Sequence, residues 1–488
     1  MDFAFFVVKK DWEEVERTER TGRDEARRRS AEGKARRLGD ELGTAALFRA
    51  AVGQCGRMSA ARVGRGGSFY GDDGKGAAYF TVAMEKTLFT FDPRCGKLLL
   101  VMIKKRLLND TLGSYFLFGP RGTGKTTWLE ERFPDAVRIS LLDSAIKRDL
   151  RAYPERLIEY IGPLVDGKTV IIDEIQRAPG LLEVIHSLMD KRQGVRFIMT
   201  GSSARKLKRN ASADLLGGRA LKRMCHPFIA AEMGEDFDLQ EALRLGMIPL
   251  VRYPVGSKSE DVLKTYLDLY LEEEITTEGV IRNLDSFSRF LKVASFSHGC
   301  VLSVSAIARE AGIKRSTLDS YFDILEEMLV ASRLPVFNKR AKRQLIGHDK
   351  FYFFDTGVFR SLRPKGPLDN PNEIDGVCLE GLVYQHIRAW NDYLNEPNEL
   401  YFWRTKNGVE VDFVIYGEST FLALEVKNSI HAERSDASGL ESFLSDYPQA
   451  KGLLLYRGER EMQVSQHVMA VPVDKFLRNL VPGREFMF

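Results

Sequence analysis

The chain has 488 residues, of which 44% are hydrophobic, and its formal net charge at pH 7 is +4. This length is enough for about three or four domains, and so small a net charge does not by itself indicate nucleic-acid binding. Five scattered cysteines without a C-x-x-C pair, and apolar runs too short to span a membrane, predict a cytoplasmic protein without a disulfide framework, a zinc site or a membrane partner.

Residues 1–100 differ in composition from the rest of the chain. Residues 13–37 are a dense mixture of Arg and Glu with few large apolar side chains, and residues 62–76 are rich in glycine. Neither stretch can bury much apolar surface, so we expect residues 1–100 to be a poorly ordered extension. This extension is either a dispensable tail or, through an upstream start, no part of the native protein. Residues 103–108 then predict a short helix.

A phosphate-binding loop is predicted after an apolar strand at residues 114–118. The spacing from Gly119 to Lys125 and Thr126 fits G-x-x-x-x-G-K-S/T, and the preceding strand argues against a chance glycine turn. Glycines let backbone N–H groups turn toward phosphate oxygens. We expect Lys125 to contact the β- and γ-phosphates of ATP and Thr126 to bind Mg²⁺. The predicted nucleotide-binding residues of the loop are Gly119, Pro120, Arg121, Gly122, Thr123, Gly124, Lys125, Thr126 and Thr127.

Two acidic residues follow a later candidate strand. Residues 169–172 are apolar or β-branched and are followed by Asp173 and Glu174. This pattern predicts a buried parallel strand that delivers both carboxylates to the edge where α/β sheets bind ligands. We expect Asp173 to hold Mg²⁺ and Glu174 to act as the general base for the attacking water. A strand is also predicted at residues 136–141.

A further strand at residues 195–200 ends in a polar turn. The hydroxyl of Ser202 could sense the γ-phosphate, and the alternative is an ordinary turn after a strand. Arg219 could act as an arginine finger, within one chain or across a subunit interface. Arg205 competes for that role, and each of the two arginines could instead be a surface cation.

Four of these segments together resemble the AAA-type P-loop ATPases: residues 119–127, 170–174, 200–203 and 218–219. The chain is more similar to a prokaryotic family of such ATPases with an additional C-terminal domain of unknown function. That similarity includes residues 246–249, 266–271 and 355–357. It extends from about residue 102 to the C-terminus, and residues 1–100 have no counterpart in the family. The resemblance implies an ATPase fold that uses ATP and Mg²⁺.

A helix-turn-helix is predicted after helices at residues 261–274 and 284–294. Residues 305–313 and 316–325 have the pattern of two helices, and Gly312 lies at the end of the first, where a turn requires it. This pair is the centre of a predicted winged helix.

A basic run follows the predicted wing at residues 329–337 and contains Lys339, Arg340, Lys342 and Arg343. A helix-turn-helix with such a run predicts contacts with DNA phosphates. Two alternatives are open, because winged helices also serve as packing modules beside ATPase domains and because basic runs are usually solvated.

The C-terminal part predicts a small α/β domain. A helix is expected at residues 379–387, followed by strands at 399–405, 409–416 and 421–427. The first two strands are separated by Asn407-Gly408, a strong signal for a tight hairpin turn.

The predicted strands carry a second candidate site. Because side chains alternate along strands, Asp412 on one strand can meet Glu425 and Lys427 on the next, so that two carboxylates bind a divalent cation and the lysine activates water. This arrangement resembles the restriction-endonuclease-like PD-(D/E)-x-K nucleases, although Val411 stands at the Pro position. The resemblance implies catalysis by Asp412, Glu425 and Lys427, with Glu380 as an additional metal ligand. The alternative is a hairpin whose outer face holds exposed salt bridges.

We therefore predict an α/β chain with several domains. They are a poorly ordered segment at 1–100, a parallel-sheet P-loop ATPase domain at 101–235, a helical lid or linker at 236–295, a winged helix-turn-helix at 296–365 and a restriction-endonuclease-like domain at 366–488. The predicted cofactors are ATP and Mg²⁺, the predicted partner is DNA, and a finger acting between subunits would imply a homo-oligomer. One hypothesis is an ATPase that works on DNA and cleaves it, and the other is a nucleotide-switched regulator whose C-terminal domain is not catalytic.

Overall fold

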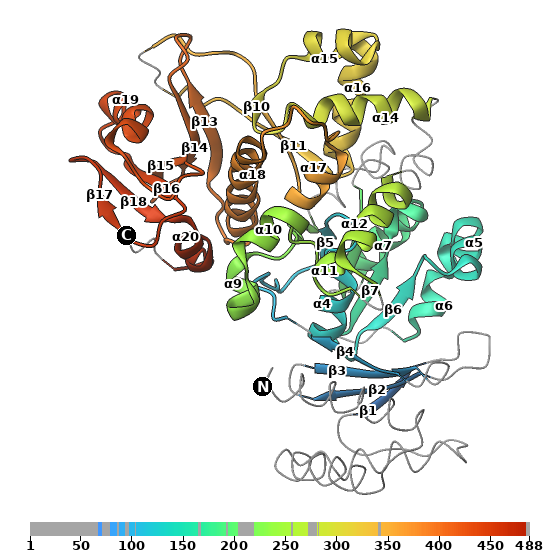
Figure 1. Cartoon of the computed structure of the whole chain (residues 1–488). Coiled ribbons are helices and arrows are strands. Elements are labelled where there is room, and N and C mark those ends of the chain that lie inside the picture. Colours follow the sequence, from blue (N-terminus) through green and yellow to red (C-terminus); the bar gives the residue numbers. More distant parts are fainter. Residues whose placement is uncertain are drawn as a thin grey trace, which may run out of the picture. The chain divides into compact units, whose positions relative to one another are not determined.

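The computed structural model describes residues 104–484 with short gaps and, separately, four strands between residues 67 and 102 (Figure 1). The gaps are residues 164–166, 192–193, 204–218, 255–256, 272–280, 282 and 340–342. The chain divides into two compact units, residues 1–100 and 101–488.

The four strands of the N-terminal region form one sheet in sequence order. They are β1 (Gly67–Tyr70), β2 (Tyr79–Met84), β3 (Thr87–Asp92) and β4 (Lys97–Met102). β2 pairs antiparallel with both β1 and β3. No strand was predicted here, and the predicted poor order of residues 1–100 otherwise lies outside the described residues.

The short helix predicted at residues 103–108 is wrong, because residues 104–110 have no helical structure. Hydrogen bonds to other parts of the chain replace those that a helix would form. The backbone N–H of Leu107 donates to Glu232 Oε1 over 2.8 Å, and the neighbouring Arg106 side chain is buried. Contacts from distant residues therefore override the local helical preference.

A five-stranded parallel sheet forms the centre of the next part, in the order β6-β7-β8-β5-β9. Its strands are β5 (Tyr115–Phe118), β6 (Val137–Ser140), β7 (Thr169–Asp173), β8 (Arg196–Gly201) and β9 (Leu221–Met224). Helix α4 (Lys125–Arg132) packs on one face, where Trp128 and Leu129 join the same apolar cluster as Tyr115 and Leu117. The cluster on the other face contains residues of α5 (Ser144–Ala152), α6 (Leu157–Ile161) and α7 (Leu181–Lys191). The predicted parallel-sheet P-loop fold is confirmed.

Short helices follow the sheet. They are α9 (Ala230–Met233), α10 (Leu239–Leu245), α11 (Pro249–Arg252) and α12 (Ser259–Thr265), and the last continues as a π-helix, η4 (Tyr266–Leu271). Single 3₁₀ turns lie at η1 (Pro154–Arg156), η2 (Ile175–Arg177) and η3 (Gly234–Asp236). The end of the helix predicted at residues 261–274 lies outside the described residues.

The predicted helix-turn-helix consists of α15 (Val304–Ala311) and α16 (Arg315–Glu327), preceded by α14 (Leu284–Ser295). Gly312 ends α15 in the left-handed conformation, at φ 66°. Strands β10 (Cys300–Val301), β11 (Ala331–Leu334) and β12 (Lys350–Phe353) form an antiparallel sheet with β12 at its centre. Helix α17 (Thr356–Leu362) follows β12.

The C-terminal part is a six-stranded mixed sheet with helices on both faces. Its elements are α18 (Pro371–Asp392), β13 (Glu399–Arg404), β14 (Glu410–Tyr416), β15 (Phe421–Val426), η5 (Arg434–Ala437), α19 (Ser438–Asp446), β16 (Lys451–Tyr456), β17 (Met462–Gln463), β18 (Val468–Pro472) and α20 (Val473–Asn479). The strand order is β13-β14-β15-β16-β18-β17. Three of the strands, β13 to β15, lie where the hairpins were predicted.

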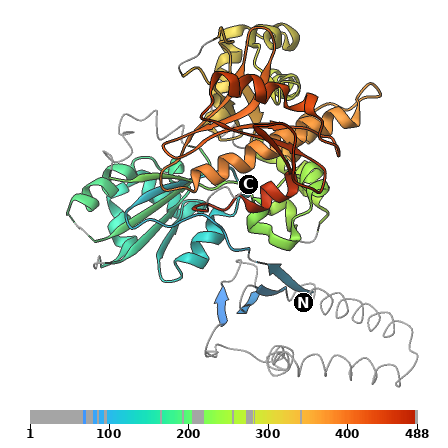
Figure 2. The ribbon, with the colours of Figure 1, turned by 90° about the vertical axis from the view of Figure 1, so that its left-hand side faces the viewer.

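Helix α18 links the C-terminal sheet to the rest of its unit. It packs against β15 on one side and against α10, α17 and β9 on others. Figure 1 shows α18 beside the C-terminal sheet, and in Figure 2 it is the orange helix that crosses the middle of the view. Helix α18 therefore contacts the C-terminal sheet through β15 and the parallel sheet through β9.

Asp355, two residues after β12, forms a second link. Its Oδ2 accepts a hydrogen bond from the Met247 N–H over 2.6 Å, and its Oδ1 accepts one from the Gly357 N–H over 2.9 Å at the start of α17. Gly246 has φ +75°, and a Cβ at that position would lie 1.9 Å from Asp355 Oδ1. Only glycine fits here, because of both the backbone conformation and the close approach.

We therefore predict that Gly246→Ala lowers the free energy of unfolding by at least about 2 kcal/mol, because it adds left-handed strain and a clash with a buried carboxylate. Thermal and urea unfolding of the full chain measure this change. Gly234→Ala is the control for backbone strain, since its φ is +61° and nothing lies within 4 Å of an added Cβ. Equal losses in the two variants would contradict the role given to Asp355.

Candidate functional site

The phosphate-binding loop has the backbone that its sequence predicts. Gly122 and Gly124 have φ values of 78° and 85°, and α4 begins at Lys125 directly after the second glycine. A Cβ on Gly119 would lie 2.2 Å from the carbonyl oxygen of Cys225 at the end of β9. Each of the three glycines is therefore required, two by conformation and one by space.

Lys125 is held inside its own loop. Its side chain is 6% exposed, and Nζ donates to the carbonyl oxygens of Gly119 and Pro120 over 2.7 and 3.1 Å. The hydroxyl of Thr123 also donates to the Pro120 carbonyl, over 2.8 Å. The loop thus keeps a fixed ammonium group among its backbone atoms, at the place where a phosphate would need a positive charge.

The residues predicted to hold Mg²⁺ lie together beside this loop. β7 and β5 both pair in parallel with β8, so their carboxyl ends share one edge of the sheet. Thr126 Oγ1 lies 3.4 Å from Asp173 Oδ2, and Thr200 from the end of β8 donates to Asp173 Oδ1. A hydroxyl and a carboxylate at the mouth of a phosphate loop are oxygen ligands of the type that Mg²⁺ prefers, so these residues fit the ion.

Glu174 is strained and held by two polar side chains. Its φ is 60°, a left-handed conformation that costs a non-glycine residue about 1–3 kcal/mol. Gln176 Nε2 donates to Glu174 Oε2, and Ser202 Oγ donates to the same oxygen over 3.3 Å. Gln176 also donates to Ser202 over 3.0 Å, and its Oε1 is buried without a hydrogen-bond partner among the described residues. Gln176 was not predicted, because its only signal in the sequence is its position two residues after Glu174.

The predicted arginine finger, Arg219, lies away from the phosphate-binding loop. Arg219 precedes β9, and its Nε pairs with Asp190 Oδ1 over 2.9 Å while Nη1 lies 2.8 Å from His186 Nε2. β9 begins beside the first residue of β5, so Arg219 lies near the amino ends of the strands, whereas the loop follows their carboxyl ends. The structure does not bring Arg219 to the loop within one chain, and a role across a subunit interface stays a prediction. Arg205 lies outside the described residues.

Arg106 joins the loop to three other segments. Its Nη1 donates to the Thr123 carbonyl over 2.7 Å, and Nη2 donates to the His226 carbonyl over 2.6 Å and to Tyr393 Oη over 3.1 Å. Nε pairs with Glu232 Oε1 over 3.0 Å, and the two side chains are 4% and 0% exposed. The role of Arg106 was not predicted, because an arginine in a basic stretch carries no local sign of burial.

Two further contacts hold the loop from outside the sheet. The backbone N–H of Leu250 in α11 donates to the Gly122 carbonyl over 3.3 Å, and the hydroxyl of Tyr266 donates to the Arg121 carbonyl over 3.1 Å. The shape of the loop therefore depends on residues well beyond its own domain.

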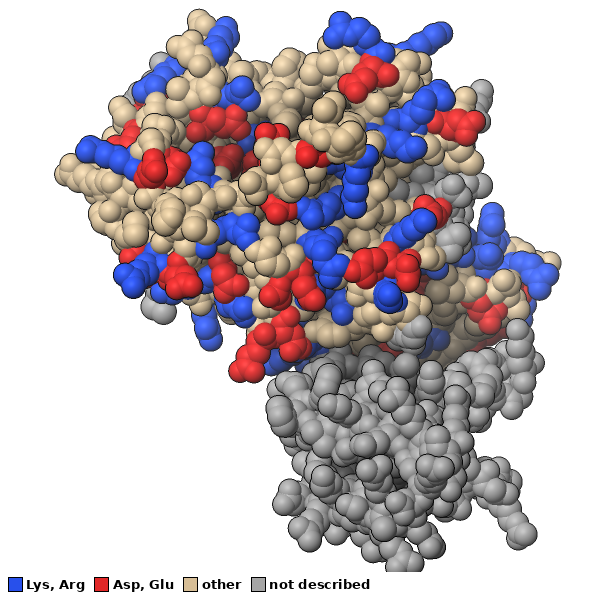
Figure 3. Space-filling model, viewed as in Figure 1, with Lys and Arg blue, Asp and Glu red and all other residues tan. Residues whose placement is uncertain are grey.

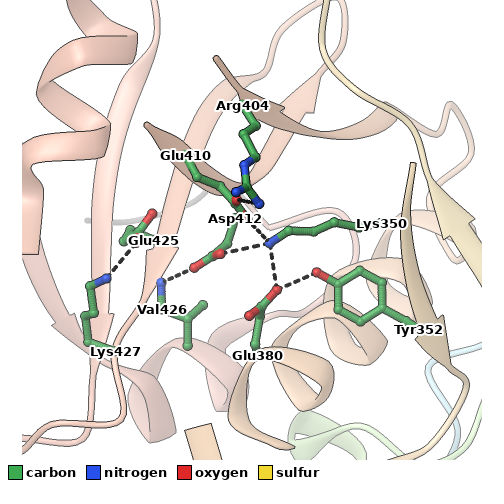
Figure 4. Close-up of polar contacts among 9 residues, drawn as sticks. All are labelled: Lys350, Tyr352, Glu380, Arg404, Glu410, Asp412, Glu425, Val426 and Lys427. Carbon is green, nitrogen blue, oxygen red and sulfur yellow. Dashed lines mark hydrogen bonds and ion pairs between the residues drawn. The ribbon is translucent and has the colours of Figure 1, made fainter. Parts of the chain in front are cut away.

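A second group of charged residues lies where the nuclease-like site was predicted (Figure 4). β14 and β15 pair antiparallel, with Phe413 opposite Leu424. Asp412 and Glu425 are the next residues along the two strands from this pair, so they also lie opposite each other. Asp412 Oδ2 accepts from the Val426 N–H over 2.9 Å, and Lys427 Nζ pairs with Glu425 Oε1 over 2.8 Å. The structure thus places Asp412 and Glu425 on neighbouring strands and Lys427 directly after the second of them.

Lys350 from β12 enters this group from another element. Its side chain is 2% exposed, and Nζ lies 2.9 Å from Glu380 Oε1 and 3.1 Å from Asp412 Oδ1, and also forms an ion pair with Glu410. The hydroxyl of Tyr352 donates to Glu380 Oε1 over 2.6 Å. Neither Lys350 nor Tyr352 was predicted, and their only visible signal is alternation with two phenylalanines along one short strand.

We call these residues the C-terminal cluster: Lys350, Tyr352, Glu380, Arg404, Glu410, Asp412, Glu425 and Lys427. Burial and the neighbouring Asp412 together raise the pKa of Glu425 to about 8, against the opposing effect of Lys427. Burial likewise raises the pKa of Glu380 to about 7, against the opposing effect of Lys350. Among the described residues, no three or more His, Cys, Asp or Glu side chains are arranged to hold a metal ion. The predicted ligands Asp412, Glu425 and Glu380 do not form such a group.

Two of the predicted DNA contacts are paired with acids of the C-terminal sheet and its helix. Lys339 forms an ion pair with Glu399, and Arg343 Nε lies 2.8 Å from Asp446 Oδ2. Arg340 and Lys342 lie outside the described residues. On the face shown in Figure 3, acidic and basic side chains are interspersed over the described surface. No helix in the described part of the chain is long and apolar enough to cross a membrane.

Comparison with known families divides the chain into three parts. Residues 113–234 match the model of an AAA domain, residues 237–369 that of a domain of unknown function, DUF8612, and residues 375–476 that of another, DUF4143. The chain therefore contains an AAA-type P-loop ATPase domain, which confirms the predicted resemblance. The two later models name domains and assign them no activity.

The similar proteins are distant. An uncharacterized protein of Mycobacterium tuberculosis is 28% identical over 366 residues, which cover 74% of this chain and 80% of the relative. One of Methanocaldococcus jannaschii is 23% identical over 62% of this chain and 72% of the relative. Among solved structures, the Aeropyrum pernix ORC1 protein in complex with DNA matches 52% of this chain and 87% of its own, at 13% identity and a TM-score of 0.22.

We predict that Arg106→Met lowers the free energy of unfolding by about 3–5 kcal/mol, since it leaves Glu232 buried without its cation. Urea unfolding measures the change. The double variant Arg106→Met/Glu232→Leu should lose less than Arg106→Met alone, because no unpaired charge remains. Lys104→Met, whose partner Asp236 is partly exposed, is the matched control and should change stability little. A small effect of Arg106→Met would contradict the central role of this arginine.

Proposed function

We propose that the chain hydrolyses ATP at the loop of residues 119–127 and uses the nucleotide state to act on DNA. One observation supports hydrolysis most directly: Lys125 and Thr126 from the loop, and Asp173 and Glu174 from the end of β7, lie at one edge of the sheet. This is the set of groups that phosphoryl transfer to water requires.

The residues divide the chemistry among them. On ATP binding, Lys125 exchanges the carbonyl oxygens of Gly119 and Pro120 for phosphate oxygens, and the backbone N–H groups of the loop surround the phosphates. Mg²⁺ held by Thr126 and Asp173 would neutralise phosphate charge. Glu174 accepts the proton of the attacking water.

Before Glu174 can act, its carboxylate has to be freed. Gln176 and Ser202 both donate to Glu174 Oε2. An oxygen that already accepts these bonds is a weaker proton acceptor, so we expect both bonds to lengthen when a nucleotide and water occupy the site. The predicted role of Ser202 near the γ-phosphate is then indirect, through the carboxylate that it holds.

Substitutions in the loop and at the general base separate binding from hydrolysis. Lys125→Ala should weaken ATP binding, whereas Glu174→Gln should bind ATP and hydrolyse it at least about 100-fold more slowly. Steady-state hydrolysis and equilibrium binding of ATP measure the two effects. Lys191→Ala, at an exposed position in α7, is the control. Parental hydrolysis rates in both site variants would refute the proposed site.

The proposed action on DNA is supported by the helix-turn-helix. The start of α16 exposes Lys314, Arg315, Ser316 and Thr317 beside the turn at Gly312. Basic and hydroxyl side chains at this position are suited to phosphate contacts, as in winged helices. The ion pairs of Lys339 and Arg343 favour a packing role for those two residues instead.

If the helix-turn-helix binds DNA, the affinity should fall steeply with salt. Reversing the charges of Lys314 and Arg315, or of Arg340 and Lys342, should weaken binding and reduce the salt slope by about 1 for each phosphate contact removed. Titration of labelled duplex DNA at several salt concentrations measures both quantities. Unchanged affinity and slope in both pairs would favour a packing role for this module.

The C-terminal domain has two candidate roles. The placement of Asp412 and Glu425 on adjacent strands, with Lys427 directly after the second strand, favours a nuclease-like metal site. Insertion of Lys350 between Glu380 and Asp412 favours the second role, a regulatory module that does not cut nucleic acid. We adopt the second role, and metal binding distinguishes the two.

A further inference from the structure

We propose that the ammonium group of Lys350 is the resident cation of the C-terminal cluster, so that this nuclease-like site does not bind a divalent metal ion in the intact chain. The inference concerns the C-terminal domain and is independent of ATP hydrolysis at the loop.

The position of Lys350 is the first support. Its Nζ contacts carboxylate oxygens of Glu380 from α18 and of Glu410 and Asp412 from β14 (Figure 4). An ammonium group has three N–H donors, and here three carboxylates are available to accept them. The side chain thus lies among the acids from two elements, where a shared metal ion would have to lie.

The oxygens of the cluster are largely in use. Asp412 gives one oxygen to Lys350 and the other to the Val426 N–H. Glu410 gives one oxygen to Lys350 and the other to Arg404, over 3.0 Å. Mg²⁺ is usually bound through one or two carboxylates and keeps several waters. Glu425 Oε2 is buried without a hydrogen-bond partner among the described residues, but an ion that also bound Asp412 would compete with Lys350 and the Val426 N–H for its oxygens.

The formal charges of the cluster nearly balance without a metal. Four carboxylates face three cations, because Lys350 and Arg404 pair with Glu380, Glu410 and Asp412, and Lys427 pairs with Glu425. The formal sum is one negative charge. No divalent ion is therefore needed to neutralise these acids.

The backbone of Lys350 is fixed. β12 is the central strand of its sheet, and Phe351 and Phe353 are fully or almost fully buried in the core. Asp355, two residues after the strand, is hydrogen-bonded to the N–H groups of Met247 and of Gly357 in α17. Lys350 is 2% exposed, so its ammonium cannot reach water without leaving its carboxylate partners.

Manganese binding tests the proposal. The full chain, free of nucleotide, is titrated with Mn²⁺ by calorimetry, and its thermal unfolding is recorded with and without Mn²⁺. We expect no Mn²⁺ binding at the C-terminal cluster and no Mn²⁺-dependent rise in Tm that Asp412→Asn removes. Lys350→Met should have a lower Tm and should gain both Mn²⁺ binding and a Mn²⁺-dependent rise in Tm, since three carboxylates lose their cation.

Lys427→Met is the matched control, because it removes a more exposed lysine from the same cluster. It should show no gain in Mn²⁺ binding. Mn²⁺ binding by the parental chain that Asp412→Asn abolishes would overturn the proposal, as would metal-dependent cleavage of DNA or RNA lost in Asp412→Ala. A folded Lys350→Met chain that gains no Mn²⁺ binding would also contradict it. If Lys350→Met does not fold, the titration of the parental and Asp412→Asn chains decides.

Discussion

A buried ion pair between Arg106 and Glu232 fixes the position of the nucleotide loop. The guanidinium also binds the carbonyl of Thr123 in the loop and the hydroxyl of Tyr393 at the end of α18. A buried charge of this kind is tolerated only when all its partners are present. The loop, the residues after β9 and the end of α18 must therefore be assembled together before Arg106 has all its hydrogen-bond partners.

The same helix and one strand connect the loop to the C-terminal cluster. Helix α18 carries Glu380 of the cluster and is followed by Tyr393, which binds Arg106. Strand β12 carries Lys350 and is followed by Asp355, which holds Met247, close to the Leu250 that binds the loop. The nucleotide loop and the C-terminal cluster are thus supported by the same two elements, α18 and β12. The residues that hold each site therefore come from distant parts of the sequence.

Local patterns predicted the parts of the structure that depend on local chemistry. The glycine loop, the acids after β7 and the hairpin strands each lie within a short segment, so spacing alone reveals them. Lys350 and Asp412 are 62 residues apart, and Arg106 and Tyr393 are 287 apart, so no local pattern could pair them. The helix expected at residues 103–108 failed for the same reason, because Glu232, distant in sequence, binds that backbone.

The central claim is that the ATP loop is built into one cooperative unit with the C-terminal domain. Thermal unfolding of the full chain with increasing ATP and Mg²⁺, followed by tryptophan fluorescence and calorimetry, tests it most directly. A ligand that binds only the folded state raises the Tm of everything that unfolds with its site. We expect one transition that moves to higher temperature as a whole. Two transitions, of which only one responds to ATP, would contradict the account.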